Sequence, residues 1–135
     1  MATQSVTSPG VGAKILVVDD TPMNVKILAD VLTFKGFRTL DAITGEEGVA
    51  LAKEHKPDLI LMDYQLPGIN GIEAFRQIRG DAATAHIPII AVTASAMPED
   101  AIKMKDAGFD GFQTKPINVK DFVQSINDLF ARRSA

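Results

Sequence analysis

The stretch Ile15-Leu16-Val17-Val18-Asp19-Asp20 decides the fold and supplies the first part of the site. Four apolar residues are followed at once by two carboxylates, and residues 59–63 repeat the arrangement as Leu-Ile-Leu-Met-Asp. A short apolar run between helical stretches is typical of a strand buried on both faces of a parallel sheet. Open sheets of this kind hold ligands just outside the carboxyl ends of their strands. We therefore expect Asp19, Asp20 and Asp63 to meet at one edge of a sheet.

Two further runs end in polar residues in the same way. Residues 89–92 precede Thr93, and residues 111–114 precede Lys115-Pro116. Apolar residues recur at helical spacing between the runs, and a strict alternation of strands and helices predicts right-handed crossovers. The predicted fold is α/β: a doubly wound, five-stranded parallel sheet of flavodoxin-like order 2-1-3-4-5 with five helices. We expect strands at residues 15–18, 37–42, 59–62, 89–92 and 111–114, and helices beginning near Pro22 (capped by Thr21), Thr44 (with Glu47 as a capping box), Ile72, Pro98 and Asn118.

Length and composition limit the function classes. With 135 residues, 46% of them hydrophobic, the chain can bury one core, and we expect a flexible leader at 1–13, one domain at 14–131 and a tail at 132–135. Cysteine is absent, which favours a reducing, cytoplasmic setting. No apolar stretch approaches the ~18 residues that span a bilayer, so no membrane association is expected. A net charge of -3 argues against a nucleic-acid partner.

The polar residues at the strand ends predict a phosphoryl-transfer site. Carboxylates that cluster within ~4 Å repel one another, so the three aspartates need a counter-charge, which Mg²⁺ and Lys115 would supply. Oxygen ligands suit Mg²⁺, with Mn²⁺ as a substitute, better than Zn²⁺. Asp63 would be the phosphoryl acceptor. Each residue taken singly has a simpler explanation as a helix cap or a solvated loop residue, and it is their co-location that favours a site.

These segments, together with Leu66-Pro67-Gly68-Ile69-Asn70-Gly71 and Val92-Thr93-Ala94, resemble the receiver domain of two-component response regulators from about Lys14 to Phe130. The resemblance implies a phosphorylation-controlled signalling switch. Its phosphoryl group would come from the phosphohistidine of a histidine kinase or phosphotransfer protein. Its output would be binding of a downstream target protein, or onward transfer. Either would use the surface formed by the helix beginning near Pro98 (helix 4), the strand at residues 111–114 (strand 5) and the helix beginning near Asn118 (helix 5). The chain would catalyse its own phosphorylation and dephosphorylation only, and would not otherwise be an enzyme.

The resemblance also assigns roles to single residues. The catalytic residues would be Asp63, Lys115 and Thr93. The metal ligands would be Asp20, Asp63 and the backbone carbonyl of Gln65, with Asp19 acting through water. The switch would comprise Thr93, Phe112 and Pro116, whose bond with Lys115 is expected to be cis. Access to the phosphoryl site would be set by Gln65, Ala94 and Ser95.

Several other functions use a similar fold. An aspartyl-phosphate phosphatase of the haloacid dehalogenase type commonly carries a second Asp two residues after the first, whereas this chain has Gln65 there. A flavin or nucleotide binder needs a Gly-rich or Ser/Thr-rich loop after strand one, but that loop reads Asp19-Asp20-Thr21-Pro22. A metal-free docking module and the receiver portion of a hybrid histidine kinase are further alternatives.

Overall fold

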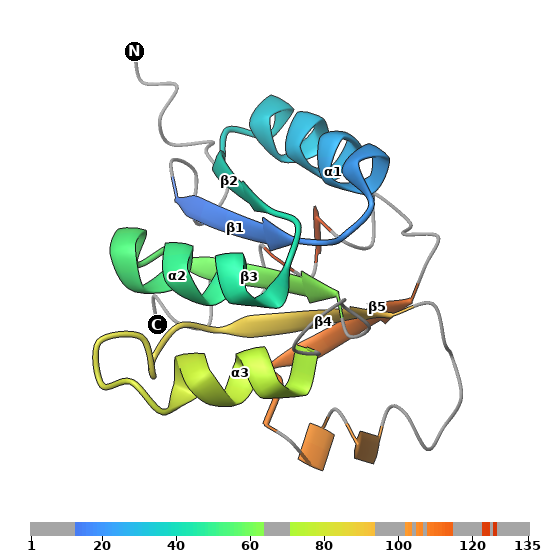
Figure 1. The fold of residues 1–135 in the computed structure, drawn as a ribbon. Coiled ribbons are helices and arrows are strands. Elements are labelled where there is room, and N and C mark those ends of the chain that lie inside the picture. Colours follow the sequence, from blue (N-terminus) through green and yellow to red (C-terminus); the bar gives the residue numbers. More distant parts are fainter. Residues whose placement is uncertain are drawn as a thin grey trace.

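The computed structural model describes residues 13–63, 71–93, 102–103, 105–106, 108–114, 123–124 and 126. Within them, strands and helices alternate along the chain from the first strand to the fourth (Figure 1). The elements are β1 (Lys14–Val18), α1 (Pro22–Phe34), β2 (Arg38–Ala42), α2 (Gly45–His55), β3 (Leu59–Asp63), α3 (Gly71–Arg79), β4 (Ile89–Thr93) and β5 (Gly111–Thr114). The helices expected after Pro98 and Asn118 lie largely outside the described residues, although residues 102–103, 105–106, 123–124 and 126 have helical backbone.

The five strands form one parallel sheet of order β2-β1-β3-β4-β5, as predicted. In the register, Val18 lies opposite Ala42 and Met62, and Asp63 lies opposite Val92. All strands run the same way, so their carboxyl ends share one edge. The order reverses between β1 and β3, which makes these two strands the switch point of the sheet.

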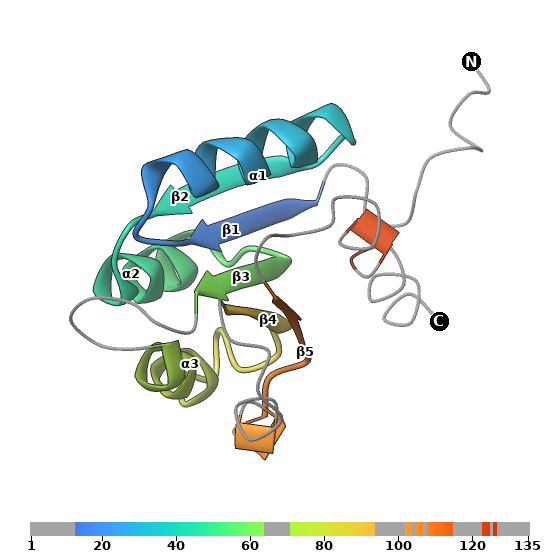
Figure 2. The same cartoon turned by 90° about the vertical axis from the view of Figure 1, so that its right-hand side faces the viewer.

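The apolar runs are buried because both faces of the sheet are covered. Figures 1 and 2 show α1 on one side of the sheet and α2 and α3 on the other. Alternate strand residues accordingly join different cores: Leu16 and Ile60 pack on the side of α2 and α3, and Ile15 and Leu61 pack on the side of α1. This division explains the continuous apolar runs, since a strand covered on both faces has no solvent side.

The three predicted helix starts that fall on described residues, near Pro22, Thr44 and Ile72, are confirmed in position, but the first differs in its capping. The Thr44 hydroxyl accepts a hydrogen bond from the Glu47 backbone N–H at 3.0 Å, as the capping box predicts, and the Glu47 carboxylate accepts one from Ile43 N–H at 2.8 Å. Thr21 occupies the N-cap position of α1, yet its side chain makes no capping hydrogen bond. The expectation of a threonine cap was therefore wrong. The Thr21 backbone N–H donates to Asp19 Oδ1 at 2.9 Å.

Candidate functional site

The three aspartates predicted from the sequence meet at the carboxyl edge of the sheet. Asp63 is the last residue of β3, and Asp19 and Asp20 directly follow β1, so the switch point brings them together. Each offers a carboxylate oxygen, and these three oxygens all lie within 4.8 Å of one another. Asp19 and Asp63 are buried, whereas Asp20 is exposed. The cluster therefore has two oxygens fixed in the protein and one facing solvent.

Local backbone contacts fix the position of Asp19. Its backbone N–H donates to the carbonyl of Ala42 at 3.0 Å, which ties the residue to the end of β2. Its Oδ1 accepts the hydrogen bond from the Thr21 N–H and so orients the carboxylate. Pro22 in the first turn of α1 carries no N–H, so the helix can begin immediately after this turn. The short Asp-Asp-Thr-Pro connection thus holds a carboxylate beside the strand end.

Thr93 is the fourth predicted residue that the structure describes in full. It is the last residue of β4 and is fully buried. Because Asp63 pairs with Val92, Thr93 lies one residue further along the neighbouring strand. Phe112 lies within β5, where its backbone pairs with Ala91. The other predicted site residues lie outside the described part of the chain: Gln65, Ala94, Ser95, Lys115 and Pro116.

The chemistry of the aspartate cluster suits a hard divalent cation. Carboxylate oxygens are the ligands that Mg²⁺ prefers, and Mg²⁺ keeps several waters, which the exposed side of Asp20 can accommodate. Three like charges within this distance are stabilised together only by a nearby positive charge. The described residues place no histidine in the cluster, and the chain has no cysteine, so softer metals lack their usual ligands.

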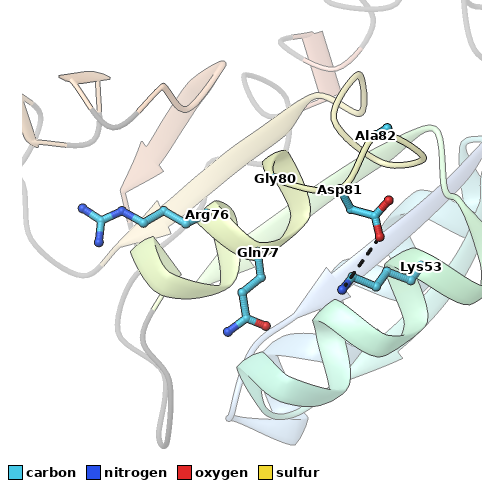
Figure 3. Close-up of a pocket in the computed structure, with 6 residues that line it drawn as sticks. All are labelled: Lys53, Arg76, Gln77, Gly80, Asp81 and Ala82. Carbon is cyan, nitrogen blue, oxygen red and sulfur yellow. Dashed lines mark ion pairs between the residues drawn. The ribbon is translucent and has the colours of Figure 1, made fainter.

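A pocket of about 530 Å³ lies elsewhere, between α2 and the end of α3 (Figure 3). Lys53 Nζ and Asp81 Oδ2 face each other at 3.8 Å, and both side chains are exposed. An exposed ion pair contributes little to stability because water screens it. The pocket contains none of the predicted site residues, and its lining is Lys53, Arg76, Gln77, Gly80, Asp81 and Ala82.

The sheet order and the carboxylates at its switch point define a doubly wound α/β protein with an acidic site for a divalent cation. Residues 15–127 match the model of the response regulator receiver domain, and the chain belongs to this family. It is therefore a phosphorylation-controlled signalling switch of the response regulator class. No helix in the described ranges has the length and apolar character required to cross a membrane.

Relatives of known name agree with this assignment. The polar-differentiation response regulator DivK of Brucella anthropi is 39% identical over 112 residues, which cover 83% of this chain and 91% of that protein. A response regulator structure from Chloroflexus aurantiacus superposes with a TM-score of 0.84 at 28% identity, covering 89% of this chain and 98% of that one. The receiver domain of a sensor histidine kinase from Pseudomonas aeruginosa, with magnesium in its active-site cleft, superposes with a TM-score of 0.80 at 33% identity. The match covers 88% of this chain and 97% of that one.

Proposed function

We propose that Asp63 is the residue that accepts the phosphoryl group. Its carboxylate ends β3 at the switch point and is buried beside Asp19 and Asp20. Of the three carboxylates, Asp20 is the one exposed to solvent. The close approach of these three carboxylates is the main observation that supports Asp63 as the acceptor.

The proposed step moves one phosphoryl group from a histidine kinase or phosphotransfer protein. An oxygen of Asp63 forms a bond to phosphorus while the bond between phosphorus and the donor's histidine nitrogen breaks, and the imidazole leaves with the electron pair. Bound Mg²⁺, or Mn²⁺ in its place, would neutralise charge on the phosphoryl oxygens. Asp20, Asp63 and the carbonyl of Gln65 would hold the ion directly, and Asp19 would do so through water. Lys115 would pair with the phosphoryl oxygens.

We further propose that Thr93 transmits the change. A phosphoryl group brings roughly two negative charges to the end of β3, and a hydroxyl at the neighbouring strand end can hydrogen-bond to it. β4 pairs directly with β5, with Ala91 opposite Phe112 and Thr93 opposite Thr114. A shift of Thr93 would therefore act on the strand that carries Phe112 and on the cis Lys115–Pro116 bond. The output surface would comprise helix 4, β5 and helix 5, with Gln65, Ala94 and Ser95 setting phosphoryl access.

The remaining proposals concern setting and extent. We propose that residues 14–131 form the receiver domain, flanked by a leader and a short tail, and that it works in the cytoplasm with a kinase and a target protein as partners. A stand-alone regulator and the receiver portion of a hybrid histidine kinase would carry out the same step. The domain would modify itself rather than turn over a small substrate.

Labelling with acetyl phosphate tests the acceptor. With Mg²⁺, intact mass spectrometry should find one added phosphoryl group on the native chain and none on Asp63→Asn, and chelation of the metal should suppress labelling. Asp30→Asn, which removes an exposed carboxylate on α1, is the matched control and should label normally. Undiminished labelling of Asp63→Asn would place the acceptor elsewhere. Sustained hydrolysis of para-nitrophenyl phosphate would favour a phosphatase instead.

A further inference from the structure

Helix α1 is apolar on two opposite faces. Val25, Leu28 and Leu32 are buried against the sheet. Three other large apolar side chains of α1 are exposed to solvent: Met23 at 66%, Ile27 at 50% and Phe34 at 85%. We call these three residues the outer stripe. A surface helix usually carries polar residues on its solvent side, so an apolar outer face indicates that something covers it.

The outer stripe lies on the side of α1 away from the sheet. At about 100° per residue, the spacings of four and seven place Met23, Ile27 and Phe34 within roughly 40° of one another. The same count puts this direction about 150° from the mean direction of the three buried residues. Figures 1 and 2 show that α1 forms the outer layer on its side of the sheet. The three side chains of the outer stripe are exposed near both ends and in the middle of the helix.

We propose that the outer stripe is covered by α1 of a second copy of this chain. Two α1 helices packed antiparallel, with a two-fold axis between residues 28 and 29, would bring Met23 of one copy level with Phe34 of the partner subunit. Contact between the Met23 thioether and the Phe34 ring is favourable, and the two-fold symmetry of the dimer forms this contact at two places. Ile27 of each copy would lie close to the axis.

The charges on α1 favour a second copy over an unrelated partner. Lys26 Nζ and Asp30 Oδ2 form an exposed pair at 3.3 Å within the helix. The axis that aligns Met23 with Phe34 of the partner subunit also places Lys26 within about 1.5 Å, along the helix direction, of Asp30 of the partner subunit. Each copy thus offers a cation where the other offers an anion. The same position of the two-fold axis therefore allows both the contact between Met23 and Phe34 and the pairing of Lys26 with Asp30.

The size of the contact sets the expected strength. The helix has 13 residues, so it is about 20 Å long, and a single helix pair buries less than the roughly 1,600 Å² of a standard stable interface. We therefore infer a weak, reversible dimer, populated at roughly tens to hundreds of micromolar. The acidic site lies beyond the amino end of α1, so dimerisation and labelling by a small donor are separate properties.

Sedimentation equilibrium of the full chain tests the dimer. The average mass should rise toward twice that of the chain as concentration increases. Phe34→Lys should raise the dissociation constant at least about tenfold, because it removes an apolar contact twice and places an ammonium group against Met23 of the partner subunit. Ile43→Lys, which replaces an exposed apolar residue outside α1, is the matched control and should leave association unchanged.

A charge exchange makes the test specific for the antiparallel pair. Lys26→Asp alone should weaken the dimer, because the new carboxylate would face Asp30 of the partner subunit. The double variant Lys26→Asp/Asp30→Lys should restore it, since both copies then exchange signs together. A chain that stays monomeric at every concentration would overturn the proposal and assign the stripe to a different protein. A dimer that Phe34→Lys and Lys26→Asp leave intact would also overturn it. Neither result bears on labelling of Asp63 by acetyl phosphate.

Discussion

A Cβ atom placed on Gly48 would lie 2.8 Å from Cγ2 of Val18, closer than two such carbon atoms can approach. Gly48 is in α2 and Val18 is the last residue of β1, so the glycine sets how closely the helix packs on the strand. Val18 is buried, and its β-branched side chain has little freedom to turn aside. This close approach holds the strand end from which Asp19 and Asp20 extend.

Replacement of Gly48 by Ala should destabilise the domain. Alanine gains about 1 kcal/mol over glycine in helix propensity, but overpacking in a well-packed core costs about 1–3 kcal/mol. We expect a net loss of about 1 kcal/mol in the free energy of unfolding, measured by urea denaturation. Combining Gly48→Ala with Val18→Ala should cost less than the sum of the two single changes, because the smaller residue makes room. Strict additivity would contradict the steric explanation.

Removal of the Thr84 hydroxyl should also lower stability. Thr84 is fully buried, and its Oγ1 donates to the Ile78 carbonyl at 2.6 Å, near the end of α3. Thr84→Val keeps the shape but leaves that carbonyl with one partner fewer, so we expect a loss of about 1–2 kcal/mol in the free energy of unfolding. Thr84→Ser keeps the donor and is the control for the hydroxyl. A valine variant as stable as the native chain would show that the bond contributes nothing.

Arg79 should be hard to replace even by lysine. Its guanidinium donates to the carbonyls of Ala85 and Ile87 and to Asp110 Oδ2, the last at 2.6 Å. Lysine has no planar fork and cannot reach three acceptors in this geometry. We expect Arg79→Lys to cost about 1–3 kcal/mol in thermal or urea unfolding. Arg76→Lys, on an exposed turn of the same helix, should change stability by less than about 0.5 kcal/mol.

These contacts mark the limit of prediction from sequence. The cluster of Asp19, Asp20 and Asp63 could be predicted because parallel strands align their ends, and the Thr44 and Glu47 cap could be predicted because its partners are three residues apart. Arg79 and Asp110 are 31 residues apart, and no spacing rule joins them. The constraint on Gly48 depends on the distance between α2 and β1, which exists only after packing. The sequence pattern also did not reveal that the Thr21 side chain makes no capping hydrogen bond.

The carboxyl of Asp41 should make a small, pH-dependent contribution to stability. Burial raises the pKa of Asp41 in the folded domain above its ordinary value of 3.8. Between the two pKa values the native state binds more protons than the unfolded state, so stability falls as pH rises through this window. Asp41→Asn should therefore raise the melting temperature modestly at pH 7. This gain should vanish when the pH is lowered below 3.8, the ordinary pKa of the carboxyl. Equal gains at pH 3 and pH 7 would contradict this cause.

The three clustered carboxylates should oppose folding when no divalent cation is present. Their oxygens lie within 4.8 Å of one another, a separation at which like charges repel by a few kcal/mol at an effective dielectric of about 20. Asp20 is exposed, so screening reduces its share of this repulsion to about 1 kcal/mol. Asp20→Asn should therefore raise the free energy of unfolding in chelator by about that amount, because one of the repelling charges is removed.

Magnesium should reverse the ranking of these two proteins. A ligand at free concentration c that binds only the folded state stabilises it by RT ln(1 + c/Kd), so millimolar Mg²⁺ should stabilise the native chain more than the weaker-binding Asp20→Asn. The measurement is thermal unfolding of both proteins over a Mg²⁺ series. Asp58→Asn is the control, since its carboxylate bonds to the Lys14 N–H away from the cluster and should leave the Mg²⁺ response unchanged. If the native chain and Asp20→Asn gained equal stability from Mg²⁺, Asp20 would not be a ligand of the ion.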